Sequence, residues 1–275
     1  MKQGGLPIST IVPTRNRADA LLRMLGSLLQ QSQQPIEMIV VDASTSADTE
    51  QLCRVGVPGL HSKIRYAKAR EVGAAAQRNQ GVTMATQPFV WFCDDDIVFE
   101  SECVVRLWLG IQSEPKVGGV NAMIINQRYQ PPGFASRVLF RLMNGRGEES
   151  YAGRVIGPAI NLLPEDRDDL PEVVSVQWLN TTCALYRREA LPSPPFDSFF
   201  TGYSLMEDLA LSLRVGQQWM LANVRTARIY HDSQPGAYKA DITEMAVMEL
   251  VNRHYVMTQV LGRKRPVDFV RLFGW

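Results

Sequence analysis

Short apolar runs alternate with amphipathic stretches from Ile8 to about Ile125. This alternation is typical of βα units that build a mostly parallel sheet. Four of the runs are rich in β-branched or aromatic residues, and turn-forming or helix-capping residues follow each of them. Ligand-binding loops lie at the carboxyl ends of such strands. The four predicted strands are Ile8–Val12, Ile36–Val41, Lys63–Tyr66 and Phe89–Cys93.

Two helices are predicted between these strands. Leucines recur at helical spacing between the first two strands, from Leu21 to Leu29, and Asp19 stands where a capping residue belongs. We expect this segment to pack on the sheet as a right-handed crossover helix. The run AAAQRNQG, residues 74–81, predicts a second helix with a small face for close packing.

The second half of the chain is less regular. Residues 126–172 contain a Pro-Pro-Gly turn, a glycine-rich stretch and an acidic patch, with little periodicity, which predicts a variable insertion or mobile loop. Regular patterns return as predicted strands at 173–178, 183–186 and 228–230. A helix is expected to start near Glu207, and a long amphipathic helix from about Asp241 to Leu261.

Composition and charge narrow the function classes. The chain has 275 residues, 45% hydrophobic and 21% charged, which is ordinary globular usage. A net charge of +1 gives no basic footprint for a nucleic acid, so none is expected as a partner. Four scattered cysteines without CxxC spacing indicate buried thiols in a reducing compartment. Without an apolar leader or an 18-residue apolar window, we expect a cytoplasmic protein.

Three carboxylates, Asp94, Asp95 and Asp96, directly follow the fourth strand. Such a cluster repels itself unless a cation neutralises it, and its hard oxygen ligands favour Mg²⁺ or Mn²⁺. The alternative is that one aspartate caps a helix beginning near Ser101 while the others are solvated.

The other strand ends also carry polar groups. The first strand runs into Pro13, Thr14, Arg15, Asn16 and Arg17, which suits a base and a phosphate. The second strand ends in a carboxylate and a hydroxyl that could either bind a ribose or simply shape a turn. The predicted helix after the third strand presents an arginine to the same edge. The carboxylate is that of Asp42, the hydroxyl is that of Ser44 and the arginine is Arg78.

Two acidic residues and a histidine stand out in the second half. Glu207 and Asp208 open a predicted helix, where they would complement its dipole or supply a catalytic base. His231 follows a short strand, where it is either structural or a metal or diphosphate contact.

The motifs IVPTRN, VDAS, AAAQRNQG and FCDDD, in this order and spacing, resemble the nucleotide-binding half of glycosyltransferase family 2. NTTCALYRREAL and YSLMEDLALSLR extend the resemblance to roughly His231. The resemblance implies the GT-A fold, an α/β fold with a Rossmann-like, mostly parallel sheet flanked by helices. It also divides a single domain of residues 1–275 into a nucleotide-sugar-binding half (6–125), the insertion (126–172), an acceptor-side half (173–235) and a C-terminal helix and tail (236–275).

The resemblance also implies residue roles. Asp96 would bind the metal, with Asp94 and His231 as further ligands, and Asp208 of the Glu207-Asp208 pair would be the catalytic base. The nucleotide-sugar would contact Pro13, Thr14, Arg15, Arg17, Asp42, Ser44, Arg78, Asp94 and Asp95.

The predicted activity is an inverting, metal-dependent transfer from a nucleotide-sugar, with UDP-sugar as the base expectation, to a hydroxyl acceptor. A glycan or lipid-linked saccharide in polysaccharide synthesis would suit as acceptor. Two basic and apolar segments, 134–143 and 263–275, suggest peripheral contact with the inner face of a membrane, or alternatively packing on the domain.

Two rival functions stay open at this stage. A catalytically silent sugar-nucleotide or glycan-binding protein would keep the pocket without turnover. A sugar nucleotidyltransferase has a related sheet but usually carries a glycine-rich loop after the first strand, where this chain has PTRNR. A Rossmann dehydrogenase is excluded because no GxGxxG follows the first strand.

Overall fold

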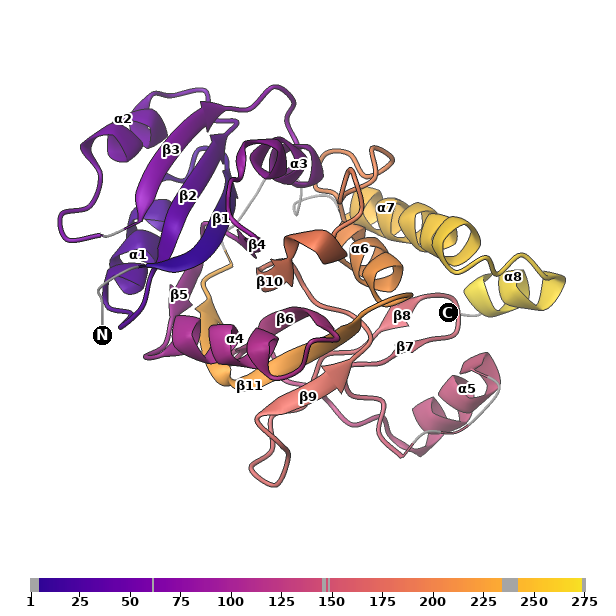
Figure 1. Cartoon of the computed structure of the whole chain (residues 1–275). Coiled ribbons are helices and arrows are strands. Elements are labelled where there is room, and N and C mark those ends of the chain that lie inside the picture. The colour runs from indigo at the N-terminus through magenta and orange to yellow at the C-terminus, as the bar shows by residue number, and fades with distance from the viewer. Residues whose placement is uncertain (1–4, 61, 145–146, 148, 234–241, 274–275) are drawn as a thin grey trace.

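The computed structural model describes residues 5–60, 62–144, 147, 149–233 and 242–273. Within this part, nine strands form one sheet in the order β3-β2-β1-β4-β10-β6-β11-β5, with β9 paired to β11 (Figure 1). A separate hairpin joins β7 and β8. The strands are β1 (Leu6–Thr14), β2 (Pro35–Asp42), β3 (Lys63–Lys68), β4 (Phe89–Cys93), β5 (Ile97–Phe99), β6 (Val117–Ile124), β7 (Val155–Ile156), β8 (Ile160–Asn161), β9 (Val173–Val176), β10 (Cys183–Arg187) and β11 (Met220–His231).

Helices cover both faces of the sheet. None of the described helices has the length and apolar character needed to cross a membrane. They are α1 (Ala18–Leu29), α2 (Asp48–Val55), α3 (Ala74–Met84), α4 (Cys103–Gln112), α5 (Phe134–Asn144), the 3-10 turn η1 (Arg188–Ala190), α6 (Glu207–Val215), α7 (Ile242–Tyr255), the π-helical turn η3 (Val256–Val260) and α8 (Pro266–Phe273).

The strand sequences explain the two-sided core. Neighbouring residues of β2 point to opposite faces, so Val40 joins the cluster under α1 and α4 while Ile39 joins the cluster under α3 and α6. A strand buried on both faces is mainly apolar, and β4 is an unbroken apolar run, whereas β1 and β2 are interrupted by the buried polar residues Ser9, Thr10 and Glu37. The pairings of β1 with β2 and β4 are parallel, as predicted, whereas β10 runs antiparallel between β4 and β6.

Several predicted boundaries need correction. Asp19 is the second residue of α1 and does not cap it; Arg17 is the N-cap residue and makes no side-chain cap bond. The expected long C-terminal helix is α7 followed by the π-helical turn η3, and its expected start at Asp241 lies outside the described residues. The strand expected at 228–230 is the end of β11. The insertion contains a helix, α5, and the β7–β8 hairpin, instead of a loop without regular structure.

Candidate active site

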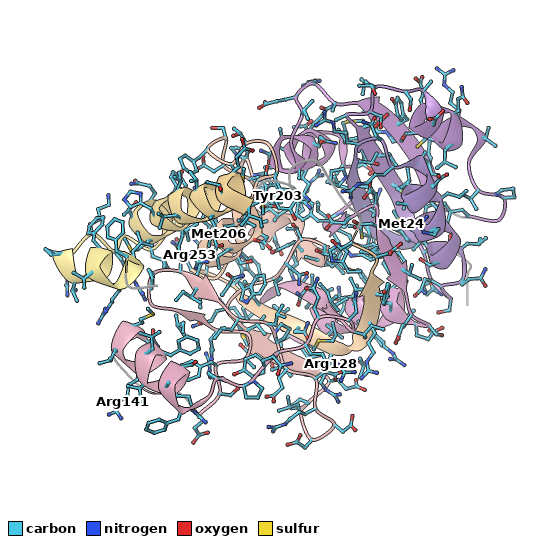
Figure 2. All side chains as sticks on the ribbon, turned by 180° about the vertical axis from the view of Figure 1, so that it is seen from behind. Met24, Arg128, Arg141, Tyr203, Met206 and Arg253 are labelled. Atoms are coloured by element: carbon cyan, nitrogen blue, oxygen red, sulfur yellow. The ribbon has the colours of Figure 1, made fainter. Side chains whose placement is uncertain are left out.

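A cleft of about 1320 Å³ opens where the carboxyl ends of β1 and β4 face the start of α6. Because β1 and β4 are parallel neighbours, their following loops meet at one edge of the sheet. Figure 2 labels Tyr203 and Met206, which line this cleft just before α6. The lining contains most of the predicted site residues: Pro13, Thr14, Arg15, Arg17, Arg78, Asp94, Asp95, Asp96, Glu207, Asp208 and His231.

The acidic loop after β4 is held by the backbone and by neighbouring side chains. The Asp94 amide donates to the Thr182 carbonyl at 3.0 Å, which continues the β4–β10 pairing. The Thr14 hydroxyl donates to buried Asp95 at 2.6 Å. Burial raises the pKa of Asp95 to about 7, against the opposing effects of Thr14 and Arg17. Within this loop, Asp95 is therefore only partly ionised near neutral pH.

Arg17 supplies a positive charge to this loop. One guanidinium nitrogen, Nη1, lies 3.3 Å from Asp95 Oδ1 and 3.1 Å from Asp96 Oδ2. Both carboxylates are nearly inaccessible, while the arginine is about a third exposed toward the cleft. Arg17 is therefore placed to neutralise the aspartates and still reach an anion in the cleft.

Asp94, Asp96 and His231 converge into one candidate metal group. Each offers a ligand atom, and these atoms all lie within 4.8 Å of one another. The sheet register causes this, because His231 of β11 pairs with Ile97 of β5, directly after the aspartates. His231 Nε2 lies 3.2 Å from Asp96 Oδ1. Two carboxylates and an imidazole suit a divalent cation such as Mn²⁺.

Arg78 joins the two walls of the cleft. Its side chain is buried, and it donates to Asp94 Oδ1 and to Glu207 Oε1, both at 2.7 Å. Burial opposes its charge, but Asp94 and Glu207 outweigh burial and raise the pKa of Arg78. The predicted role of Arg78 in contacting a diphosphate stays a prediction; the described contacts are with the two carboxylates.

Glu207 and Asp208 form the first turn of α6. Met206 and Ser204, just before it, have positive φ angles of 73° and 58°, which are uncommon for residues with a side chain. Asp208 Oδ1 accepts a hydrogen bond from the Leu209 amide at 2.7 Å. Burial raises the pKa of Asp208 to about 6, so this carboxylate is ionised near neutrality while retaining basicity. Burial also raises the pKa of Glu207, against the attraction of Arg78.

The structure does not bring Asp42 and Ser44 into the lining of the cleft. Asp42 is fully buried; Oδ1 accepts from the Ser44 amide at 2.7 Å and Oδ2 from the Tyr66 hydroxyl at 3.0 Å. Ser44 Oγ accepts from the Asn16 amide at 2.7 Å. These bonds correspond to the turn-shaping alternative, and direct contact of the two residues with a nucleoside stays a prediction.

Sequence reasoning missed several residues of the cleft. Buried Gln77 donates through Nε2 to the Thr14 carbonyl at 3.0 Å and the Val41 carbonyl at 2.7 Å, so one amide ties the ends of β1 and β2. Gly73 and Gly202 form an isolated parallel bridge between the loops that precede α3 and α6. Gln77 precedes Arg78 in the motif AAAQRNQG, and this position is the one sequence signal that could have indicated a role for Gln77 at the cleft.

Comparisons with known proteins identify the family of this chain. The family model described as "Glycosyl transferase family 2" matches residues 9–192. An uncharacterised glycosyltransferase of Rickettsia felis is 27% identical over 101 residues, which cover 36% of this chain and 16% of that protein. A PGL/p-HBAD biosynthesis glycosyltransferase of Mycobacterium bovis is 27% identical over 100 residues, covering 36% and 39%. The matched regions thus span well under half the length of these relatives.

Solved structures share the fold over most of the chain. The mannosyltransferase PcManGT from Pyrobaculum calidifontis, in complex with GDP-Man and Mn²⁺, has a TM-score of 0.63 and 17% identity, over 98% of this chain and 69% of that one. S. aureus TarS 1-349 in complex with UDP-GlcNAc has a TM-score of 0.58 and 16% identity, over 94% and 72%. At this level of identity the likeness establishes the GT-A arrangement of sheet and helices, which confirms the predicted fold class.

Proposed function

Because this chain belongs to glycosyl transferase family 2, we propose that it transfers a sugar from a nucleotide-sugar donor to a hydroxyl group of a saccharide acceptor. One observation carries the proposal: the Asp94, Asp96 and His231 group and the Asp208 carboxylate face the same cleft. The two parts of the cleft correspond to the two needs of the reaction, a place for a charged leaving group and a base.

The donor is proposed to be a UDP-sugar. Among the solved structures with this fold, GalNAc-T7 was determined with UDP, GalNAc and Mn²⁺, and TarS with UDP-GlcNAc, whereas PcManGT was determined with GDP-Man. The loop after β1 supplies Thr14, Arg15 and Arg17 to the cleft. Guanidinium groups at this edge suit a diphosphate, because they can donate paired hydrogen bonds to its oxygens.

Asp96, Asp94 and His231 are proposed to hold Mn²⁺ or Mg²⁺. The donor set fits: two carboxylate oxygens and one imidazole nitrogen lie close enough to share an ion. Gln127 Nε2 donates to His231 Nδ1 at 3.3 Å, so the proton of a neutral ring lies on Nε2, which faces Asp96 Oδ1 at 3.2 Å. For Nε2 to bind a cation, that proton would move to Nδ1 and the Gln127 amide would turn its oxygen toward the ring. A bound divalent cation would neutralise charge that develops on the departing nucleoside diphosphate.

Asp208 is proposed as the general base of a single displacement that inverts the anomeric carbon. It lines the cleft on the wall opposite the acidic loop, and its raised pKa still leaves it deprotonated at neutral pH. The ion pair between Arg78 and Glu207 fixes the Glu207 side chain and so stabilises the first turn of α6. With Glu207 paired to Arg78, Asp208 is the carboxylate of this turn that is available to an acceptor hydroxyl.

The acceptor is proposed to be a glycan or a lipid-linked saccharide in polysaccharide synthesis, met at the cytoplasmic face of a membrane. The cleft volume of about 1320 Å³ exceeds the range of roughly 300–1,000 Å³ that is usual for a single small ligand. A donor and an acceptor sugar could therefore be bound together.

The test is Asp208→Asn compared with Asp19→Asn, a substitution of another cleft-lining aspartate without an assigned role. Turnover of a panel of nucleotide-sugars would be followed with Mn²⁺, and donor binding by calorimetry. We expect Asp208→Asn to lose about 10²–10⁴ in turnover with unchanged donor binding, because a positioned base contributes that much. Near-wild-type turnover in Asp208→Asn would refute the assignment, and donor binding without any transfer by the wild type would favour a silent binding protein.

A further inference from the structure

Helix α5 exposes an apolar face that the rest of the described chain does not cover. Phe134, Val138 and Leu142 recur every four residues and are 87%, 46% and 66% exposed. The opposite side of the helix is buried, because Phe140 and Met143 pack against the β7–β8 hairpin through Ile156 and Ile160. One side of the helix thus packs on the protein, and the other side presents a row of large apolar side chains to the surroundings. Such a row differs from the single exposed hydrophobic residues that are common on protein surfaces.

Helix α8 has the same character. Val267, Val270 and Phe273 are 47%, 71% and 75% exposed, whereas Leu272 is buried. In both figures α5 and α8 lie at the same end of the molecule, away from α2 (Figures 1 and 2). The β7–β8 turn lies between them, since Arg263 donates to the Gly157 carbonyl and Gly157 is packed against Met143. The exposed residues of α5 and of segment 263–273 are called the α5/α8 face below.

The charge on the α5/α8 face is strongly positive, although the whole chain carries only +1. Residues 134–144 and 263–273 contain six basic residues, Arg137, Arg141, Arg263, Lys264, Arg265 and Arg271, and one acidic residue, Asp268. Asp268 is buried and accepts from the Arg265 amide at 3.0 Å. Figure 2 labels Arg141, an exposed residue of α5.

We propose that the α5/α8 face docks the protein on an anionic lipid surface, with the apolar side chains inserted among the headgroups and the basic residues against their phosphates. Apolar stripes flanked by arginine and lysine are the pattern of helices that lie in a membrane interface. A second copy of the chain is a poorer occupant, because a symmetric contact would place this positive face against itself.

Helix α7 links α8 to the cleft wall. Asn252 of α7 donates to the carbonyl of cleft-lining Leu205 at 2.7 Å, and the Tyr255 ring stacks on Phe199 with 3.8 Å between centroids. His254 of α7 contacts Phe269 of α8 with 5.9 Å between ring centroids. Docking would therefore hold the acceptor side of the cleft near the lipid surface. Only the lipid-linked nature of the acceptor rests on the proposed function; the docking on lipid does not depend on it.

Sedimentation of the full chain with vesicles tests the docking without donor or acceptor. The probes are phosphatidylcholine vesicles with and without about 30% phosphatidylglycerol, at low and at physiological salt. We expect binding to the anionic vesicles that weakens with salt, and a loss of at least about tenfold in Phe134→Glu and in Val270→Glu. Removing one exposed arginine, as in Arg141→Gln, should cost about fivefold. Val55→Glu, at a residue of α2 that is 84% exposed, is the matched control and should bind like the wild type.

Absence of wild-type binding to anionic vesicles at low salt would overturn the inference, and so would equal binding by the wild type, Phe134→Glu and Val270→Glu. A wild-type dimer in analytical ultracentrifugation that Phe134→Glu dissociates would also overturn it, in favour of a second copy. Transfer of sugar to a soluble acceptor separates this inference from the proposed function. Phe134→Glu should retain that activity. A wild type that binds anionic vesicles but transfers no sugar would refute the proposed function and leave the docking inference intact.

Discussion

Removal of the Arg78 guanidinium is the sharpest perturbation that the site offers. Arg78→Met keeps much of the side-chain volume but leaves Asp94 and Glu207 without the group that donates to both at 2.7 Å. Truncating one partner of a buried ion pair costs about 3–5 kcal/mol, since a carboxylate stays buried without compensation. For a domain of this size that corresponds to a fall in melting temperature of roughly 6–20 °C.

The cost should depend on pH in a defined direction. Without Arg78, the pKa of Glu207, already raised by burial, would rise further. A carboxyl group with a raised pKa in the folded state destabilises more as pH increases, so Arg78→Met should be closest to the wild type in mildly acidic solution. Adding Glu207→Gln should recover part of the lost stability, because it removes one uncompensated charge.

Urea unfolding at two pH values would measure these effects, with Arg54→Met as the control. Arg54 also pairs with a glutamate, Glu50, but its side chain is 76% exposed, so its removal should cost less than about 1 kcal/mol. Equal costs for Arg78→Met and Arg54→Met would refute the reasoning, as would a cost that grows toward acidic pH.

Three further outcomes are expected. Asp96→Ala should lose Mn²⁺-dependent donor binding in calorimetry, and chelation should abolish transfer by the wild type; full turnover after exhaustive dialysis against a chelator would contradict the metal requirement. The value of kcat/KM should rise as pH increases through about 6, because Asp208 acts as a base only when deprotonated, and a flat profile over that range would count against its role. Gly81→Ala should cost about 1–3 kcal/mol in urea unfolding, because its Cβ would lie 2.4 Å from Ile11 Cγ2; Gly26→Ala, with nothing within 4 Å, is the control and should not destabilise.

The first four strands could be predicted for two reasons. Strands β1, β2 and β4 are mainly apolar and buried on both faces, whereas in β3 the half-buried Ile64 and Tyr66 alternate with Lys63 and Arg65. Strand β6 could not be predicted, although every residue in it is buried. Its sequence VGGVNAMI contains Gly118 and Gly119, which weaken a strand pattern. A Cβ on Gly118 would lie 2.5 Å from Trp219, and one on Gly119 2.6 Å from Tyr186. Those neighbours come from distant segments, so the reason for the glycines is tertiary.

The site was predictable in its residue types and less so in its contacts. Carboxylates at a strand end and at a helix start are local signals, and the motifs that contain Asp94, Asp96 and Asp208 indicated the cleft. The pairing of Arg78 with Glu207 was not predictable, because the two residues are 129 positions apart in sequence. Asp42 shows the converse: it stands at a strand end like the others, but Tyr66 on the neighbouring strand β3 turns its carboxylate into the interior.

The position of β10 in the sheet has a consequence for protein engineering. This strand lies between β4 and β6, although about 60 residues separate it from β6 in the chain. The match to the family model ends at residue 192, just after β10. A chimera that joins the first 125 residues of this chain to another relative would thus replace a central strand and its two neighbouring contacts, not a peripheral module. A crossover after β10 would keep β4, β10 and β6 together, but α6 and β11, which bring Asp208 and His231 to the cleft, would then come from the other relative.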